Sequence, residues 1–152
     1  MIILSIYPEH VKLIERGIKK FEFRKIFSKK TKRKLLNSKY IVVYETSPKS
    51  AITLILVIGE IIENRISSLW ENFGCNSGIT KEYFMKYYKK DIKGTAFEIK
   101  EFFVLDNPIS LKDIKRKYKN FTPPQNFYNL DEKSYPKLYK ELINVIKSKE
   151  KS

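Results

Sequence analysis

Residues 16–25 constrain the fold of this chain more than any other segment, because a helix terminator is followed at once by a strand of alternating character. The segment reads Arg-Gly-Ile-Lys-Lys-Phe-Glu-Phe-Arg-Lys. Glycine readily adopts the left-handed conformation that ends helices, and successive side chains of a strand point to opposite faces. The two phenylalanines are therefore expected on a buried face, and Lys20, Glu22 and Arg24 on the other.

The charged face of this strand is a candidate ligand site. Arg24 offers a guanidinium fork, Glu22 a carboxylate acceptor and Lys19 a point charge, which together suit a phosphate or the polar edge of a base. Whether Lys19 shares the face of Glu22 depends on how the turn at Gly17 enters the strand. The alternative is a salt-bridged surface cluster, which contributes only about 0–1 kcal/mol when exposed.

The charge of the chain favours a polyanionic partner. Its 152 residues include 31 basic and 17 acidic side chains, a net charge of +14, and 14% of them are aromatic. Basic surfaces that also carry aromatic rings suit RNA or another nucleic acid. The alternative is that genome base composition has enriched lysine, so that the charge serves solubility alone.

Other functional classes are excluded by what the chain lacks. One cysteine, Cys75, and one histidine, His10, cannot form an internal disulfide or a structural zinc site, so we expect no metal and no other cofactor. His10 is expected on a helix surface.

The longest apolar run, residues 52–59, is far shorter than the ~20 residues that span a bilayer. We expect a cytoplasmic protein with no membrane partner, and its first residues lack a signal-peptide pattern.

Apolar periodicity and terminator residues indicate the order of the elements. Strands are expected at residues 2–6, 20–26, 40–45, 51–62 and 94–105. Helices are expected at residues 8–16, 67–73, 81–88 and 134–147 and after Ser110, with Ser67, Thr80 and Ser110 as N-caps. Residues 28–39 are rich in lysine and arginine and are expected to form an exposed basic loop.

These elements predict a single α+β domain over residues 1–152. Helices fill an insertion at about 67–90 and the end of the chain at about 134–147. Gly59 interrupts the longest apolar strand, where a bulge or a barrel corner fits. About five to six strands with such a corner favour a mixed β-barrel with flanking helices.

The segment after residue 16 also resembles a family signature. Gly17-Ile-Lys19-Lys-Phe-Glu22-Phe-Arg24 is similar to the Gly-x-Lys-x-x-Glu-x-Arg signature of ASCH domains, which belong to the PUA-like superfamily. Further segments are similar to a stand-alone ASCH branch and follow in order at residues 4–10, 44–48, 69–74, 78–82, 94–99 and 123–127.

The resemblance implies a PUA-like β-barrel that binds RNA or a modified nucleobase, with a regulatory role in transcription or translation. It also implies a hydrolase as the alternative, because one ASCH branch hydrolyses the N4-acetyl amide of acetylcytidine and another member is described as a ribonuclease. The lysine of the amidohydrolase branch falls on Lys19, but its threonine falls on Glu22, so that nucleophile is missing. If the chain is an enzyme, Lys19 and Glu22 are the expected catalytic pair.

Further candidate contacts lie outside the signature. Tyr44 and Phe127 are candidates for stacking on a base, and Gln125, in a loop stiffened by two prolines, for a polar contact. Thr46 and Ser47 are candidate hydroxyl groups from a neighbouring strand.

The basic segment supplies candidate phosphate contacts at Lys29, Lys30, Lys32 and Arg33. A protein-interaction module without a nucleotide ligand stays open as a third function class. The sequence leaves the oligomeric state and the choice between RNA and DNA undefined.

Overall fold

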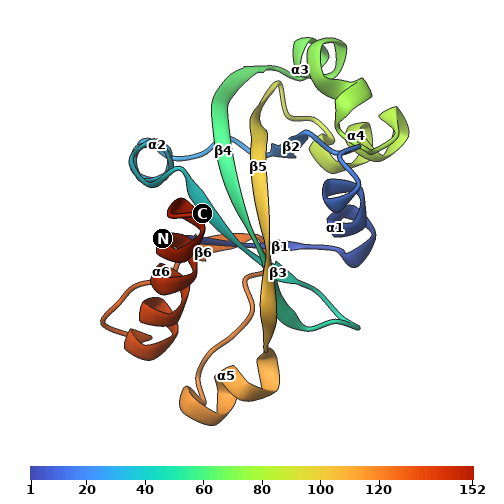
Figure 1. Cartoon of the computed structure of the whole chain (residues 1–152). Helices are drawn as coiled ribbons and strands as arrows, with labels where there is room; N and C mark the ends of the chain where they lie inside the picture. Colours follow the sequence, from blue (N-terminus) through green and yellow to red (C-terminus); the bar gives the residue numbers. More distant parts are fainter. The chain divides into compact units, whose positions relative to one another are not determined.

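The computed structural model describes residues 1–152 and contains a six-stranded mixed sheet (Figure 1). The strands are β1 (Ile2–Ile6), β2 (Phe21–Arg24), β3 (Tyr40–Glu45), β4 (Ala51–Arg65), β5 (Lys93–Ser110) and β6 (Phe127–Asn129). Their order in the sheet is β2-β5-β4-β3-β1-β6. β1 runs parallel to β3, whereas the pairs β1–β6 and β2–β5 are antiparallel. The expected α+β class with about six strands is confirmed.

Six α-helices and one short 3-10 helix accompany the sheet. They are α1 (Pro8–Glu15), α2 (Lys29–Ser38), α3 (Ile66–Phe73), η1 (Gly74–Asn76), α4 (Lys81–Tyr88), α5 (Leu111–Lys117) and α6 (Pro136–Glu150). The side chains of Thr80 and Ser110 cap α4 and α5, as expected. No helix combines the length and the apolar character that a membrane crossing requires.

The chain divides into two compact units that share the two longest strands. Unit 1 comprises Met1–Pro8, Tyr40–Leu56 and Phe102–Ser152, and unit 2 comprises Glu9–Lys39 and Val57–Glu101. β4 and β5 each contribute one part to unit 1 and the other part to unit 2. Each unit has a hydrophobic cluster of its own.

The cluster of unit 1 joins α6 to the parallel strands. Leu138, Leu142 and Ile146 recur at helical spacing on α6 and are buried. They belong to the same cluster as Ile3 and Val42, which lie opposite each other on β1 and β3. This side of unit 1 therefore follows the periodicity expected from the sequence.

The cluster of unit 2 is built on aromatic rings. Phe23 is the inward residue of β2 and meets Phe84 with 4.7 Å between ring centroids. Phe84 in turn meets Tyr88 on the next turn of α4, at 4.9 Å. Phe21 is half-buried and packs on Phe73 at 4.5 Å. Such aromatic pairs contribute about 0.5–1.5 kcal/mol beyond their buried area.

The expectation of a basic loop at residues 28–39 is wrong, because this segment contains helix α2. The Ser28 side chain accepts the N–H of Thr31 and caps the helix, while Leu35 anchors it with 1% exposure. Lys39 ends the helix in the left-handed conformation, with a φ of 62°. Lysine and arginine are themselves good helix formers, so charge alone did not indicate a loop.

Other boundaries also differ from the sequence expectations. β4 continues to Arg65 and β5 to Ser110, because strand pairing extends beyond the apolar runs. The N-cap of α3 is Arg65, without a side-chain hydrogen bond, and not Ser67. The strand β6 was not expected, since only three residues of it pair with β1.

A stability prediction follows from Gly94, which lies against the ring of Tyr88. A Cβ atom at this glycine would stand 2.5 Å from the ring, and the Tyr88 hydroxyl is fixed by donation to the carbonyl of Arg24 at 2.7 Å. We expect Gly94→Ala to lower the free energy of unfolding by about 1–3 kcal/mol through overpacking, measured by urea denaturation. The matched control is Lys93→Ala at the exposed neighbour, expected to change stability by about 0.5 kcal/mol or less. Equal midpoints for the two variants would contradict the close contact.

Candidate nucleic-acid site

Strand β2 presents Glu22 and Arg24 on the face opposite to Phe23. It pairs antiparallel with β5, so that Glu22 lies opposite Phe97 and Arg24 opposite Thr95. Phe23 is held in the hydrophobic cluster of unit 2. Because strand side chains alternate, this anchoring fixes the direction of both charged side chains.

Lys19 joins these two residues although it precedes the strand. Gly17 has a φ of 73°, and the turn that it permits is closed by the N–H of Lys19, which donates to the carbonyl of Leu13 at 3.0 Å. The Lys19 side chain is fully buried, and its Nζ donates to the carbonyl of Ser77 at 2.7 Å. The same nitrogen lies 3.6 Å from Oε1 of Glu22.

Glu22 lies between two cations. Its Oε2 is 3.8 Å from Nη2 of Arg24, and its Oε1 accepts the N–H of Phe23 at 3.2 Å. Burial alone would raise the pKa of this carboxyl, but the charge of Lys19, followed by that of Arg24, outweighs burial and lowers the pKa below its usual 4.5. Glu22 is therefore ionised at neutral pH.

We call Lys19, Glu22 and Arg24 the ion trio. The exposure of their side chains rises from 0% for Lys19 to 10% for Glu22 and 12% for Arg24. Oε2 of Glu22 is covered and accepts no hydrogen bond. The predicted grouping of these three residues is therefore present, with Lys19 as the buried counter-ion and Arg24 as the outermost member.

His10, expected on a helix surface, feels the charges of the ion trio. It is half-buried on α1, and its ring meets that of Tyr83 edge-on with 5.7 Å between centroids. Burial lowers the pKa of His10, the charge of Lys19 lowers it further, and the charge of Glu22 acts in the opposite direction. The only feature of the sequence that pointed to this position of His10 was the tight turn at Gly17, which returns the chain from α1 to β2.

The basic helix α2 belongs to the same unit as the ion trio. It contains five basic residues and no acidic one. Lys29, Lys30 and Arg33 are exposed, and Lys32 is half-buried. The four predicted phosphate contacts therefore lie on one helix instead of a loop, which holds their spacing fixed.

The other predicted contacts belong to unit 1. Tyr44 is part of the unit 1 cluster and only 3% exposed, so its ring offers no face for stacking on a base. Phe127 is half-buried on β6. Thr46 is half-buried and its Oγ1 has no hydrogen-bond partner, whereas Ser47 and Gln125 are exposed.

The loop that carries Gln125 is held by β1. Ser5 donates its N–H to the carbonyl of Asn126 at 3.0 Å and its hydroxyl to the carbonyl of Pro124 at 2.5 Å. Gln125 thus extends from a backbone that is fixed on both sides. This arrangement agrees with the stiff loop expected from the two prolines.

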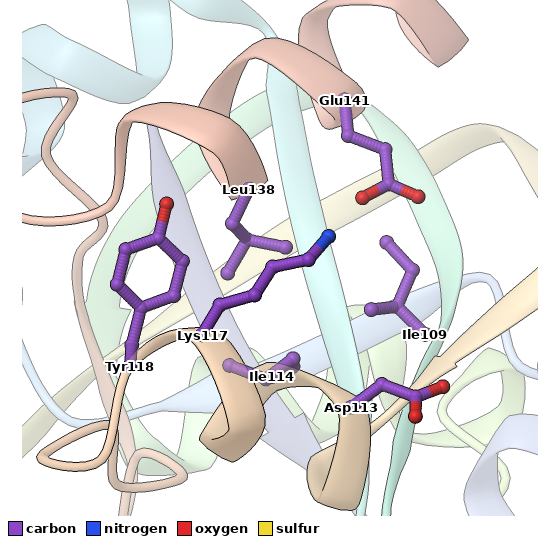
Figure 2. Close-up of a pocket in the computed structure, with 7 residues that line it drawn as sticks. All are labelled: Ile109, Asp113, Ile114, Lys117, Tyr118, Leu138 and Glu141. Carbon is purple, nitrogen blue, oxygen red and sulfur yellow. The ribbon is translucent and has the colours of Figure 1, made fainter.

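A small pocket in unit 1 contains none of the predicted site residues. Figure 2 shows Leu138 and Glu141 of α6 facing Ile114 and Lys117 of α5. Its volume of about 20 Å³ has room for roughly one water molecule. A nucleotide does not fit there.

The charge state of Glu22 makes stability depend on pH. Because its pKa is lower in the folded chain than in the unfolded chain, the carboxylate stabilises the fold above about pH 4.5, and this contribution is lost as pH falls through the folded pKa. We expect Glu22→Gln to destabilise the chain by about 3–5 kcal/mol at pH 7, since the buried Lys19 loses its counter-ion. The deficit relative to the unmodified chain should shrink below pH 4.5, measured by urea denaturation at several pH values.

The matched control for this measurement is Glu60→Gln, at an exposed carboxylate of the same unit. It should leave stability nearly unchanged over the same range of pH. A deficit of Glu22→Gln that is constant from pH 7 to pH 3 would contradict the ionised state of Glu22.

Comparison with known proteins places the chain among relatives of similar length. No family model matches it. It is 26% identical over 136 residues to the "ASCH domain-containing ribonuclease" of Zymomonas mobilis, which covers 90% of this chain and 88% of the relative.

Solved structures show the same likeness. The crystal structure of ASCH from Zymomonas mobilis superposes with a TM-score of 0.74 at 25% identity and covers 91% of this chain and 93% of its own. A serine-to-alanine variant of that protein gives 0.76 at 26% identity, with coverages of 91% and 94%. The N-terminal domain of McrB from Staphylothermus marinus shares the fold alone, with a TM-score of 0.53 at 12% identity and coverages of 89% and 90%. The signature residues, the mixed α+β fold and these likenesses agree, and all of them show that the chain is similar to stand-alone ASCH-domain proteins.

Proposed function

We propose that this ASCH-domain protein binds single-stranded RNA through unit 2. The proposal rests on the side-chain exposure of the ion trio, which increases from Lys19 through Glu22 to Arg24. Arg24 is thus the most exposed member, beside a buried pair of opposite charges. Two cations share the carboxylate of Glu22, so the trio carries one net positive charge, which favours a phosphate at its most exposed member, Arg24. A guanidinium fork suits phosphate oxygens, with which it makes two parallel hydrogen bonds.

The cations of α2 extend this binding surface within unit 2. Lys29, Lys30 and Arg33 are exposed, and α2 carries no acidic residue that would neutralise them. Phosphate contacts of this kind supply affinity that does not depend on sequence. A cytoplasmic location and an RNA partner both belong to this proposal.

A second candidate function is RNA cleavage. The relative from Zymomonas mobilis carries the name ribonuclease and matches 90% of this chain. Glu22 and His10 supply a carboxylate and an imidazole beside the cation of Arg24, which are the group types that general acid–base catalysis uses.

The amidohydrolase alternative has less support. It requires Lys19 to activate a hydroxyl group, but Nζ of Lys19 is fully buried and donates to the carbonyl of Ser77. Position 22 carries a carboxylate in place of the threonine. In unit 1, Thr46, Ser47, Gln125 and Phe127 are retained as proposed RNA contacts.

The salt dependence of RNA affinity tests the role of α2. We expect the unmodified chain to show a steep negative slope of the logarithm of the binding constant against that of the salt concentration, about −0.7 for each phosphate contact. The triple variant Lys29→Gln, Lys30→Gln, Arg33→Gln should make this slope less steep by about 2. Fluorescence anisotropy with a labelled single-stranded RNA measures both values.

The matched control removes three exposed lysines from α6 in unit 1, Lys137→Gln, Lys140→Gln and Lys147→Gln. It changes the net charge equally and should change the slope by less than half as much. Equal effects of the two triple variants would contradict a binding surface on α2. Absence of binding at low salt would contradict the proposed function itself.

A further inference from the structure

We propose that the carboxylate of Glu45, at the end of β3 in unit 1, selects a guanine base of the bound RNA. This inference rests on the proposed RNA binding and deepens it, because it names the preferred base and the residue that recognises it. It concerns a residue outside the ion trio. Glu45 was not among the contacts that the sequence predicted.

Glu45 is an exception within its strand. The residues of β3 before it are apolar or aromatic, and glutamate is depleted in strands. In the register of the sheet it lies opposite Ile6, the last residue of β1, and it is only 8% exposed. Acidic side chains that are buried to this extent are normally paired. A position at which a sequence departs from such rules is expected to serve a function.

The carboxylate of Glu45 has no partner within the chain. None of the 31 basic side chains forms an ion pair with it, and no group of the chain donates a hydrogen bond to it. Both of its oxygens keep contact with solvent, although the residue as a whole is buried. In the free chain only water can satisfy these acceptors, and a ligand that donates N–H groups can take the place of that water.

Other polar groups lie at the same end of the sheet. The N–H of Thr46 donates to the carbonyl of Ile6 at 3.0 Å, and Oγ1 of Thr46 is covered and has no hydrogen-bond partner. Ser5 holds the residues on both sides of Gln125 through their carbonyl groups. Neighbouring strands lie about 4.8 Å apart, so these groups come from within two strand spacings of Glu45. A hydroxyl group and an amide, which can both donate hydrogen bonds, thus accompany the two carboxylate acceptors.

Guanine matches this set of groups better than the other bases do. Its Watson–Crick edge presents two adjacent donors, N1–H and the 2-amino group, beside the acceptor O6. The two oxygens of a carboxylate can accept both donors in parallel, and a hydroxyl or amide donor can bind O6. Adenine and cytosine present an amino group next to an acceptor nitrogen, and uracil presents one N–H between two acceptors. Each of these three bases would therefore bring an acceptor against the carboxylate.

Two observations favour a base over other ligands. The guanidinium group of an arginine also presents two parallel donors, but the net charge of +14 repels a basic protein segment and attracts RNA. Tyr7, which follows Ile6, is 53% exposed, and a tyrosine ring is a surface on which a base can stack. A phosphate does not suit Glu45, because both groups present only acceptors and carry charge of the same sign.

The first experiment changes the base and leaves the chain unmodified. Short labelled oligouridine strands carry a single guanine, inosine, adenine or cytosine at the centre, and fluorescence anisotropy measures their affinity. We expect the guanine strand to bind about 10–100-fold more tightly than oligouridine. Inosine lacks the 2-amino group and should lose most of this preference.

The outcomes of this experiment separate the inference from the proposed function. Equal binding of all strands, or adenine or cytosine strands that bind as tightly as guanine, would overturn the inference and leave the proposed function standing. Absence of binding to every strand at low salt would overturn the proposed function itself, and the inference with it.

The second experiment tests Glu45 directly. Glu45→Gln keeps the size of the side chain but replaces one acceptor by a donor, so the preference for guanine over uridine should fall to about 3-fold or less. The affinity for oligouridine should stay nearly unchanged. The matched control is Glu132→Gln, at an exposed carboxylate of unit 1, which removes the same charge and should keep the full preference.

A merely structural role of Glu45 would give a different result. Equal weakening of all strands by Glu45→Gln, in a variant that urea denaturation shows to be folded, would overturn the proposal. If this variant does not fold, the comparison of guanine with inosine on the unmodified chain decides.

Salt and competition identify the ligand group. A contact to a base edge releases no counterions, so the preference for guanine should be the same at low and high salt. A preference that disappears as salt rises would assign it to phosphate contacts and would overturn the proposal. Arginine amide that competes with the guanine strand as well as guanosine 5′-monophosphate does would indicate an arginine-bearing partner and would also overturn it.

Discussion

The burial of the Lys19 ammonium group is the constraint on which unit 2 depends. A charge removed from water must be paired and hydrogen-bonded, and the chain meets this need with the carbonyl of Ser77 and the carboxylate of Glu22. Ser77 lies between η1 and α4 in the helical segment that joins β4 to β5, so this one nitrogen ties that segment to the start of β2. The helical segment and the signature strand therefore support each other.

This pairing also decides which charges remain for a ligand. Lys19 and Glu22 cancel, so that the cluster has a net positive charge located on its outermost member, Arg24. Burial lowers the pKa of His10, the charge of Lys19 lowers it further, and the charge of Glu22 opposes both. The three charges that the signature places in sequence therefore differ in exposure, with Lys19 fully buried and Arg24 the most exposed.

The sequence predicted those features that rest on local chemistry. The alternation of residues 20–24, the terminating Gly17, and the caps Thr80 and Ser110 were all recognised, because each follows from the nearest few residues. The helix α2 was mistaken for a loop, since a single buried leucine anchors it among charges. The half-burial of His10 could not be predicted, because the ring that it meets, that of Tyr83, belongs to a segment distant in the sequence.

The contact between Tyr88 and Gly94 has a consequence for the divergence of related chains. The tyrosine hydroxyl lies within hydrogen-bond distance of two carbonyl groups, those of Arg24 and Thr95, while its ring fills the space above the glycine. Neither residue can change freely while the other stays, so the two positions should vary together during evolution. A descendant that gains a side chain at position 94 would recover stability by replacing the tyrosine, and the strand that bears Arg24 would then need a new hydrogen-bond donor.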